Sequence, residues 1–220
     1  MKDFPVFTTE HGVASLILKE IPYRAEAFIR IQSTQEPELL LKDCMGFCTA
    51  CGAEKVYASG HEYLERFPLH AAIYRMTGQI RLQNAAEVPP MFPVTPTTAA
   101  RWREIYNERM KHVDNASTLE QRDEEKLSSS GAYFIHRAGE LLGIGWLEDT
   151  HLNAIASVQP GAGEAICRAM QSLIPRQQIT LEVASTNTRA ISLYERLGLL
   201  KVEELSRWYQ VFNELSRKNT

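Results

Sequence analysis

The stretch Leu181–Leu199, LEVASTNTRAISLYERLGL, decides the fold class of this chain. Hydrophobic and polar residues alternate at its start, which predicts a strand over Ile179–Val183. A polar loop follows. Hydrophobic residues then recur at helical spacing over Thr188–Leu197, and Gly198 stands where a glycine commonly ends a helix. The stretch is therefore predicted to be a strand, a loop and a helix.

A second connection from strand to helix lies just upstream. A strand predicted over Leu152–Val158 runs through the glycine-containing turn QPGAG, residues 159–163, into a helix predicted over Glu164–Ile174. Glycine lets the backbone adopt positive φ and approach a ligand closely, and the unpaired N–H groups of a helix start suit a pyrophosphate. Two glycines in a turn are also compatible with a plain connection, so this feature alone does not decide the function.

The longer stretch resembles the GNAT superfamily of N-acetyltransferases. In that family a strand is followed by Asn, by Arg-Ala, and then by Leu-Tyr-Glu-Lys/Arg-Leu-Gly-Phe. The sequence here runs Asn187, Arg189-Ala190 and LYERLGL without a gap. The expected order of elements from Pro93 to Phe212 agrees with the family as well. The resemblance implies an α/β, GNAT-like acyl-CoA N-acyltransferase fold, with a mixed, mostly antiparallel central sheet flanked by helices.

The resemblance also implies an activity, the transfer of acetyl from acetyl-CoA to a primary amine without a metal. Pantetheine would lie between the strand ending at Val158 and the strand Ile179–Val183. The Val158 N–H would bind the thioester carbonyl, and Tyr194 would protonate the leaving thiolate. The acceptor would be a small molecule or a peptide. The residues implied in binding CoA are Ala156 and Val158 through the main chain, Gly161, Ala162, Gly163 and Glu164 at the pyrophosphate, and Asn187, Ala190 and Leu193 along the pantetheine arm.

The glycine turn departs from the family pattern. It is shorter, it contains no Arg or Lys, and Glu164 adds a negative charge at the helix start. A catalytically silent GNAT-fold module that binds a metabolite or a protein is therefore the alternative function.

The general base is not assigned by the sequence. Glu148, Asp149 and His151, in a predicted turn between two strands, are candidates, and His136 is another. Two aromatic residues near the C-terminus, Trp208 and Tyr209, would face either an acceptor or the core.

The first part of the chain is predicted to repeat the pattern of the second. Its expected order from Val13 to Met76 is ββαβαβ, and it repeats an Ala-Ser followed by Glu-Arg within a hydrophobic segment. Leu64 aligns with Tyr194, and the segment Ile31–Pro37, which aligns with the glycine turn, has no glycine. The similarity between the two parts would be explained either by a diverged duplication or by two amphipathic segments that are alike by coincidence. Prolines at 89, 90 and 93 predict a boundary, giving a degenerate lobe over 1–88 and a catalytic domain over 89–220 in tandem.

Three cysteines suggest a different function. Cys44, Cys48 and Cys51 have the C-x3-C-x2-C spacing of radical-SAM enzymes, whose thiolates hold an iron–sulfur cluster. A zinc site is a further interpretation of the same three cysteines. The same spacing places all three on one face of a helix predicted over Pro37–Gly52, as small residues of a core. Core packing is the prediction we adopt.

Composition excludes several classes of protein. The net charge of −3 argues against a nucleic-acid or anionic-membrane surface. Residues 1–12 lack the pattern of a signal peptide, and no stretch approaches the roughly 18 apolar residues of a membrane span. Crowded cysteines suggest reduced thiols, so we expect a cytoplasmic protein. The sequence leaves open whether the chain forms a homodimer.

Overall fold

The computed structural model describes residues 5–80 and 88–213 of the chain. The chain divides into two compact units, Met1–Ala72 together with Leu205–Thr220, and Ile73–Glu204. Strand β5 (Leu69–Gly78) begins in the first unit and ends in the second, whereas β11 (Leu200–Asn213) does the reverse. The boundary predicted between positions 88 and 89 falls inside the second unit of this division and stays a prediction.

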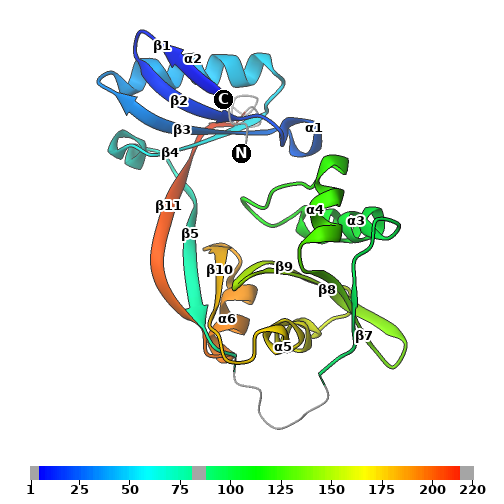
Figure 1. Cartoon of the computed structure of the whole chain (residues 1–220). Helices are drawn as coiled ribbons and strands as arrows, with labels where there is room; N and C mark the ends of the chain where they lie inside the picture. The colour runs from blue at the N-terminus through cyan, green and yellow to red at the C-terminus, as the bar shows by residue number, and fades with distance from the viewer. Residues whose placement is uncertain (1–4, 81–87, 214–220) are drawn as a thin grey trace. The chain divides into compact units, whose positions relative to one another are not determined.

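The first unit is a sheet with one long helix on it (Figure 1). The strand order is β1-β2-β3-β4-β11, in which only β3 and β4 are parallel. The predicted turn around Pro22 is one turn of helix α1, and β1 was not predicted. The elements are β1 (Val6–Thr9), β2 (Gly12–Ile17), α1 (Ile21–Arg24), β3 (Glu26–Thr34), α2 (Pro37–Ala50), β4 (Lys55–Ser59) and the 3-10 helix η1 (Glu62–Arg66).

Helix α2 provides the core of the first unit. Leu40, Cys44 and Cys48 are fully buried on one side of the helix, where they pack in one cluster with Ile29 of β3 and Tyr209 of β11. The C-terminal end of β11 is thus part of the core formed by the N-terminal residues.

The second unit continues the strand order as β11-β5-β10-β9-β8-β7-β6. Neighbouring strands are antiparallel where their register is given, except β9 and β10, which are parallel. Its elements are β6 (Met91–Pro93), α3 (Ala99–Met110), η2 (Gln121–Asp123), α4 (Glu124–Ser129), β7 (Ala132–Arg137), β8 (Glu140–Glu148), β9 (His151–Ser157), α5 (Gly163–Leu173), β10 (Ile179–Ala184) and α6 (Thr188–Arg196).

Strand β8 shows why helices pack on both faces of this sheet. A Cβ added at Gly145 would lie 2.6 Å from the sulfur of Met170, so α5 lies directly against the glycines of β8. The side chains of Ile144 and Trp146, which alternate with Gly143 and Gly145, point to the other face, since side chains alternate along a strand. Trp146 accordingly meets Trp102 of α3, with ring centroids 6.2 Å apart.

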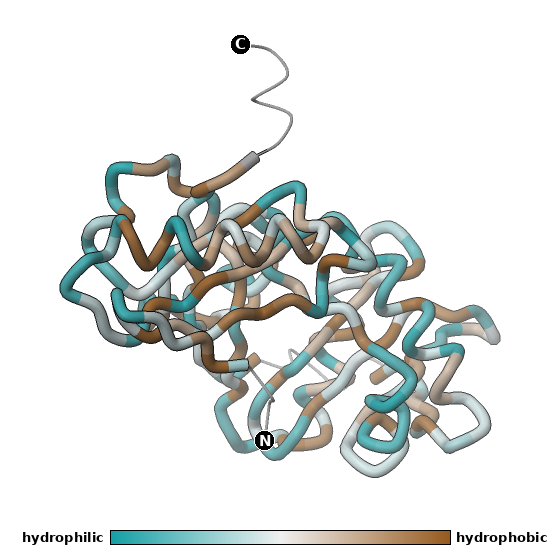
Figure 2. The backbone as a smooth tube through the Cα atoms, turned by 90° about the horizontal axis from the view of Figure 1, so that it is seen from above, coloured by the Kyte–Doolittle hydropathy of each residue, from teal (hydrophilic) through white to brown (hydrophobic). Residues whose placement is uncertain are grey.

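The predicted fold class is confirmed. The sheet is mixed and mostly antiparallel, with helices flanking it. The proline-rich stretch adds only a three-residue strand, β6, at the outer edge, where a missing N–H is tolerated. Within residues 5–80 and 88–213, no helix combines the length and hydrophobicity that a membrane crossing requires. Hydrophilic residues recur between hydrophobic ones along the chain (Figure 2).

Candidate active site

The sheet of the second unit opens between β9 and β10. The two strands pair only at their N-terminal ends, at Thr180 and His151. Beyond that pair, β10 stays bound to β5 as far as Ala184, and β9 stays bound to β8 as far as Ser157. In the first unit the parallel strands β3 and β4 pair over five residues. The two parallel pairs therefore differ, and only the β9–β10 pair separates within the described strands.

At the end of β9, the main chain of every second residue forms hydrogen bonds with β8. The N–H of Val158 donates to the carbonyl of Leu142, at 2.8 Å. Hydrogen-bonded and non-hydrogen-bonded pairs alternate in an antiparallel ladder, so Ala156 also bonds toward β8, opposite Ile144. The main-chain groups that point away from β8 belong to Ile155 and Ser157. The N–H of Val158, which the sequence predicts at the thioester, thus already has a partner in β8.

The turn after β9 leads tightly into α5. The N–H of Ala162 donates to the carbonyl of Gln159, at 3.3 Å, and Gly161 has φ of 80°, a value that favours glycine. Helix α5 begins at Gly163, with Ala162 at its N-cap position and no side-chain cap. The first N–H groups of a helix have no partner within it. These groups can bind an anion.

Helix α6 lies against the start of α5. A Cβ added at Gly163 would be 2.8 Å from Cδ2 of Leu193, so the absence of a side chain permits this approach. Asn187 caps α6, and its Oδ1 accepts from the N–H of Ala190 at 3.2 Å. The structure thus brings the glycine turn and α6 together, while Asn187 has a local role in addition to the predicted one.

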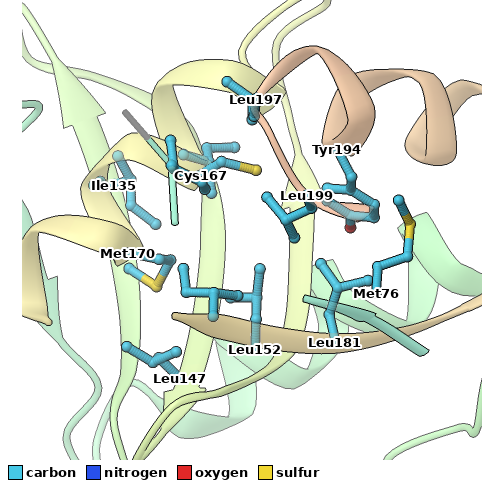
Figure 3. Close-up of a cluster of buried hydrophobic side chains, with 14 of the residues drawn as sticks. Met76, Ile135, Leu147, Leu152, Cys167, Met170, Leu181, Tyr194, Leu197 and Leu199 are labelled. Atoms are coloured by element: carbon cyan, nitrogen blue, oxygen red, sulfur yellow. The ribbon is translucent and has the colours of Figure 1, made fainter. Parts of the chain in front are cut away.

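Tyr194 lies in the core between α5, α6 and the sheet. Only 8% of it is exposed, and it shares a cluster with Met76, Cys167, Leu181 and Leu199 (Figure 3). Burial raises the pKa of its hydroxyl far above the ordinary value, and proximity to Cys167 acts in the same direction. The hydroxyl is therefore protonated at neutral pH, as a proton donor must be.

The charges around the turn come from other elements. Glu164 accepts from Arg168, with Nε at 3.0 Å and an Nη at 2.9 Å, so its negative charge is paired. Arg109, at the end of α3, donates from an Nη to the carbonyl of Val158 at 3.2 Å. Sequence reasoning missed Arg109, because no motif links α3 with a turn that lies far downstream.

Among the candidate general bases, Glu148 is the one whose partners are fixed. The hydrogen bond from Lys126, at 2.9 Å, holds the pKa of Glu148 below its ordinary value, and the bond from Asn153 acts in the same direction. A carboxylate with a lowered pKa is a weak base. Asp149 forms the turn itself, with φ of 52°, and His151 is half-buried at the start of β9.

His136 and the two C-terminal aromatic residues are parts of packed regions. The ring of His136 meets Phe92 edge-on, with centroids 5.1 Å apart, and its Nδ1 is buried without a partner among the described residues. Trp208 packs against Phe28, and Tyr209 lies in the core of the first unit. Trp208 and Tyr209 are 7% and 8% exposed, which favours the core over an acceptor site.

The cysteines of α2 are packed like core residues. Burial raises the pKa of Cys44 to about 11 and that of Cys48 to about 12, so both thiols are protonated at neutral pH. Cys51 is exposed at the end of the helix, so the core-packing prediction is wrong for this cysteine. In the part of the chain that the structure describes, no group of three His, Cys, Asp or Glu residues is arranged to hold a metal ion.

The sequence matches no protein-family model and no curated protein. Solved structures do match. A conserved protein of unknown function from Staphylococcus epidermidis has a TM-score of 0.61 and 11% identity, over 96% of this chain and 94% of that chain. A GCN5-related N-acetyltransferase from Sphaerobacter thermophilus has a TM-score of 0.53 and 13% identity, over 90% and 75%. The protein has a GNAT-like fold.

A third structure agrees with this result. A GCN5-related N-acetyltransferase-like protein from Streptococcus suis has a TM-score of 0.50 and 11% identity, over 94% of this chain and 88% of that chain. Identities this low establish the GNAT-like fold alone, so the activity has to be argued from the residues of the second unit.

Proposed function

We propose that this protein is an N-acetyltransferase that transfers acetyl from acetyl-CoA to a primary amine of a small molecule or a peptide, in the cytoplasm. The observation that carries the proposal is the opening between β9 and β10 beside the glycine turn at the start of α5. An extended pantetheine arm needs free main-chain groups along a strand, and a pyrophosphate needs free N–H groups at a helix start. The second unit offers both next to each other.

In this proposal the binding groups differ in one respect from those expected from sequence. The main chain of Ile155 and Ser157 hydrogen-bonds the pantetheine, since the N–H of Val158 and the main chain of Ala156 are directed toward β8. The other proposed contacts follow the earlier expectation. They are the N–H groups of Gly161, Gly163 and Glu164 for the pyrophosphate, and Asn187, Ala190 and Leu193 for the pantetheine arm. The N–H of Ala162, also expected at the pyrophosphate, donates to Gln159 within the turn.

The proposed chemistry requires little from the protein. The amine nitrogen forms a bond to the acetyl carbon while the bond from that carbon to sulfur breaks, and the thiolate takes up a proton. The hydroxyl of Tyr194 is the proposed donor, because it lies on α6 beside the proposed pantetheine contacts and is protonated at neutral pH. The ammonium product of the attack loses its proton to water or to a base of the acceptor site.

We further propose that the first unit is a degenerate copy of the second. Both contain three neighbouring antiparallel strands, a helix, and a fourth strand parallel to the third, although in the first unit the short helix α1 separates β2 from β3. In the first unit this parallel pair stays closed over five residues, so the main-chain groups that would hold pantetheine are used within the sheet. Leu64, in place of Tyr194, offers no proton. This copy is accordingly expected to bind no CoA.

Calorimetric titration of the full chain with acetyl-CoA tests the proposal. We expect a dissociation constant below about 1 mM, which corresponds to roughly 4 kcal/mol of binding free energy. Gly163→Val should weaken binding, because its side chain would collide with Leu193. Gly46→Val, where a Cβ meets open space on α2, is the control that should leave binding unchanged.

The alternative function is a catalytically silent module of the same fold. The feature that favours it is the turn at residues 159–162, which contains no basic residue. Absence of acetyl-CoA binding in the titration would reject the acetyltransferase and support the silent module. Where acetyl-CoA binds, thiol release in the presence of a panel of amines identifies the acceptor class.

A further inference from the structure

Arg109 is placed at the glycine turn by the tertiary structure. It lies in the last turn of α3, is exposed, and donates to the carbonyl of Val158, the residue that follows β9. The chain turns back directly afterwards, through the hydrogen bond between Ala162 and Gln159, and enters α5. The guanidinium is thereby held next to the segment that leads to the free N–H groups of α5.

The charge of Arg109 acts on the neighbouring Glu108 without forming an ion pair with it. No carboxylate of residues 5–80 or 88–213 forms an ion pair with it, and its neighbour Glu108 pairs with Lys111 instead, at 2.7 Å. In contrast, Arg168 is occupied by Glu164. A guanidinium has five N–H donors, and the bond to Val158 uses one of them. Arg109 therefore has spare donors and a positive charge beside a turn that has no basic side chain.

We propose that Arg109 binds the pyrophosphate of the CoA nucleotide and supplies the positive charge that the glycine turn lacks. This inference rests on the proposed acetyl-CoA site. A fork of N–H donors matches the oxygens of a phosphate, and the contact adds to those from the start of α5. Because the helix end and the turn come together only in the folded chain, a turn without a basic residue can still bind a dianionic group.

The experiment compares Arg109→Gln with the wild-type chain against three ligands. CoA and dephospho-CoA both contain the pyrophosphate, and pantetheine lacks it. We expect Arg109→Gln to weaken CoA and dephospho-CoA by about tenfold or more, the usual effect of losing a charged hydrogen bond, and to leave pantetheine unchanged. Arg101→Gln removes the same charge from the first turn of α3, where Arg101 pairs with Glu104, and should change none of the three.

Each outcome has a defined meaning. Equal weakening of all three ligands would show that Arg109 only positions the end of β9, which overturns the proposal. Weakening of CoA but not of dephospho-CoA would place Arg109 at the other phosphate and also overturns it. Arg109→Lys keeps the charge and should recover part of the affinity for dephospho-CoA, which covers the case in which Arg109→Gln does not fold. No binding of CoA to the wild type would reject the proposed function itself.

Discussion

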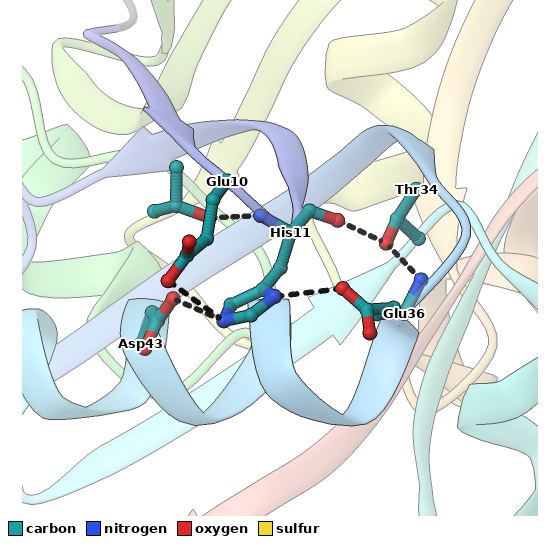
Figure 4. Close-up of polar contacts among 6 residues, drawn as sticks. Glu10, His11, Thr34, Glu36 and Asp43 are labelled. Carbon is teal, nitrogen blue, oxygen red and sulfur yellow. Dashed lines mark hydrogen bonds and ion pairs between the residues drawn. The ribbon is translucent and has the colours of Figure 1, made fainter.

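At the scale of single residues, His11 connects the turn between β1 and β2 with the start of α2. Its Nδ1 lies 2.8 Å from Glu36, and its Nε2 lies 3.7 Å from Glu10 and 4.0 Å from Asp43 (Figure 4). The hydrogen bond with Glu36 raises the pKa of His11, and the charges of the three carboxylates act in the same direction. A protonated His11 thus stabilises the folded first unit.

The pH dependence of stability follows from this shift. A raised pKa in the folded state means that the stabilisation is fully present below the unfolded pKa of about 6.5, and is lost as the pH rises through the folded value. We expect the difference in urea midpoint between the wild type and His11→Gln to be largest near pH 5.5 and to shrink above about pH 8. A difference that grows with pH would contradict this assignment.

Tyr194 is the residue on which the proposed chemistry depends. Phenylalanine fits the same apolar surroundings, so Tyr194→Phe should leave the fold and the affinity for acetyl-CoA almost unchanged. Loss of a general acid is expected to lower kcat by about a hundredfold. Steady-state kinetics with the best acceptor amine measures this effect, and Tyr23→Phe, at an exposed tyrosine of α1, is the control. An unchanged kcat would remove Tyr194 from the acid role.

At the scale of secondary-structure elements, the packing of α5 on β8 holds the glycine turn in place. Glycines on the face of β8 toward α5 allow this packing, since a Cβ at Gly143 would lie 2.3 Å from the carbonyl of Ala156 and 2.5 Å from Ile166. The position of the helix start, and hence of its free N–H groups, depends on this close contact. The glycines of β8 therefore help to position the candidate site without being proposed as ligand contacts.

Two glycine substitutions should have opposite effects on stability. Gly143→Ala overpacks a contact with main-chain atoms, which cannot move away easily, and should lower the free energy of unfolding by about 1–3 kcal/mol. Gly46→Ala lies on the exposed side of α2 with open space around its Cβ, and should raise it by about 0.5–1 kcal/mol, because alanine favours the helix. Chemical denaturation measures both, and a destabilised Gly46→Ala would contradict the assignment of α2.

At the scale of the whole molecule, both units depend on strands that lie far apart in the sequence. The first unit consists of the N-terminal residues and the C-terminal half of β11, whose Tyr209 pairs with Ala58 of β4 and is buried in the same core. The second unit begins within β5, which pairs with β10 from Ile73 to Gly78. The first unit therefore combines two distant pieces of the chain, and the second unit is the continuous piece between them.

This arrangement predicts a long-range effect of a C-terminal substitution. Tyr209→Ala removes a large buried side chain and should destabilise the first unit by about 3–5 kcal/mol. Amide hydrogen exchange should accelerate in β2, β3 and β4, although these strands lie more than a hundred positions earlier. Tyr209→Phe keeps the ring and is the control. Unchanged exchange in these strands would show that β11 contributes little to the first core.

Much of the site could be predicted from local sequence. The strand, turn and helix on either side of Gly161 depend on neighbouring residues, so hydrophobic spacing and glycine chemistry are sufficient to predict them. The cap at Asn187 was not predicted. The bonding of Val158 and Ala156 could not be predicted, because it depends on the register between β8 and β9. A shift of one residue exchanges which main-chain groups are free.

The sequence by itself determined the element order of the second unit and the amphipathic face of α6, because both follow from periodicities within short segments. The GNAT-like fold class was implied by the resemblance of residues 181–199 to that family. Only the tertiary structure decided that β9 and β10 separate while β3 and β4 stay paired, that Arg109 meets the end of β9, and that β11 serves both units. The physical reason is the same in each case. These features depend on pairing and packing between residues distant along the chain, and no local preference specifies them.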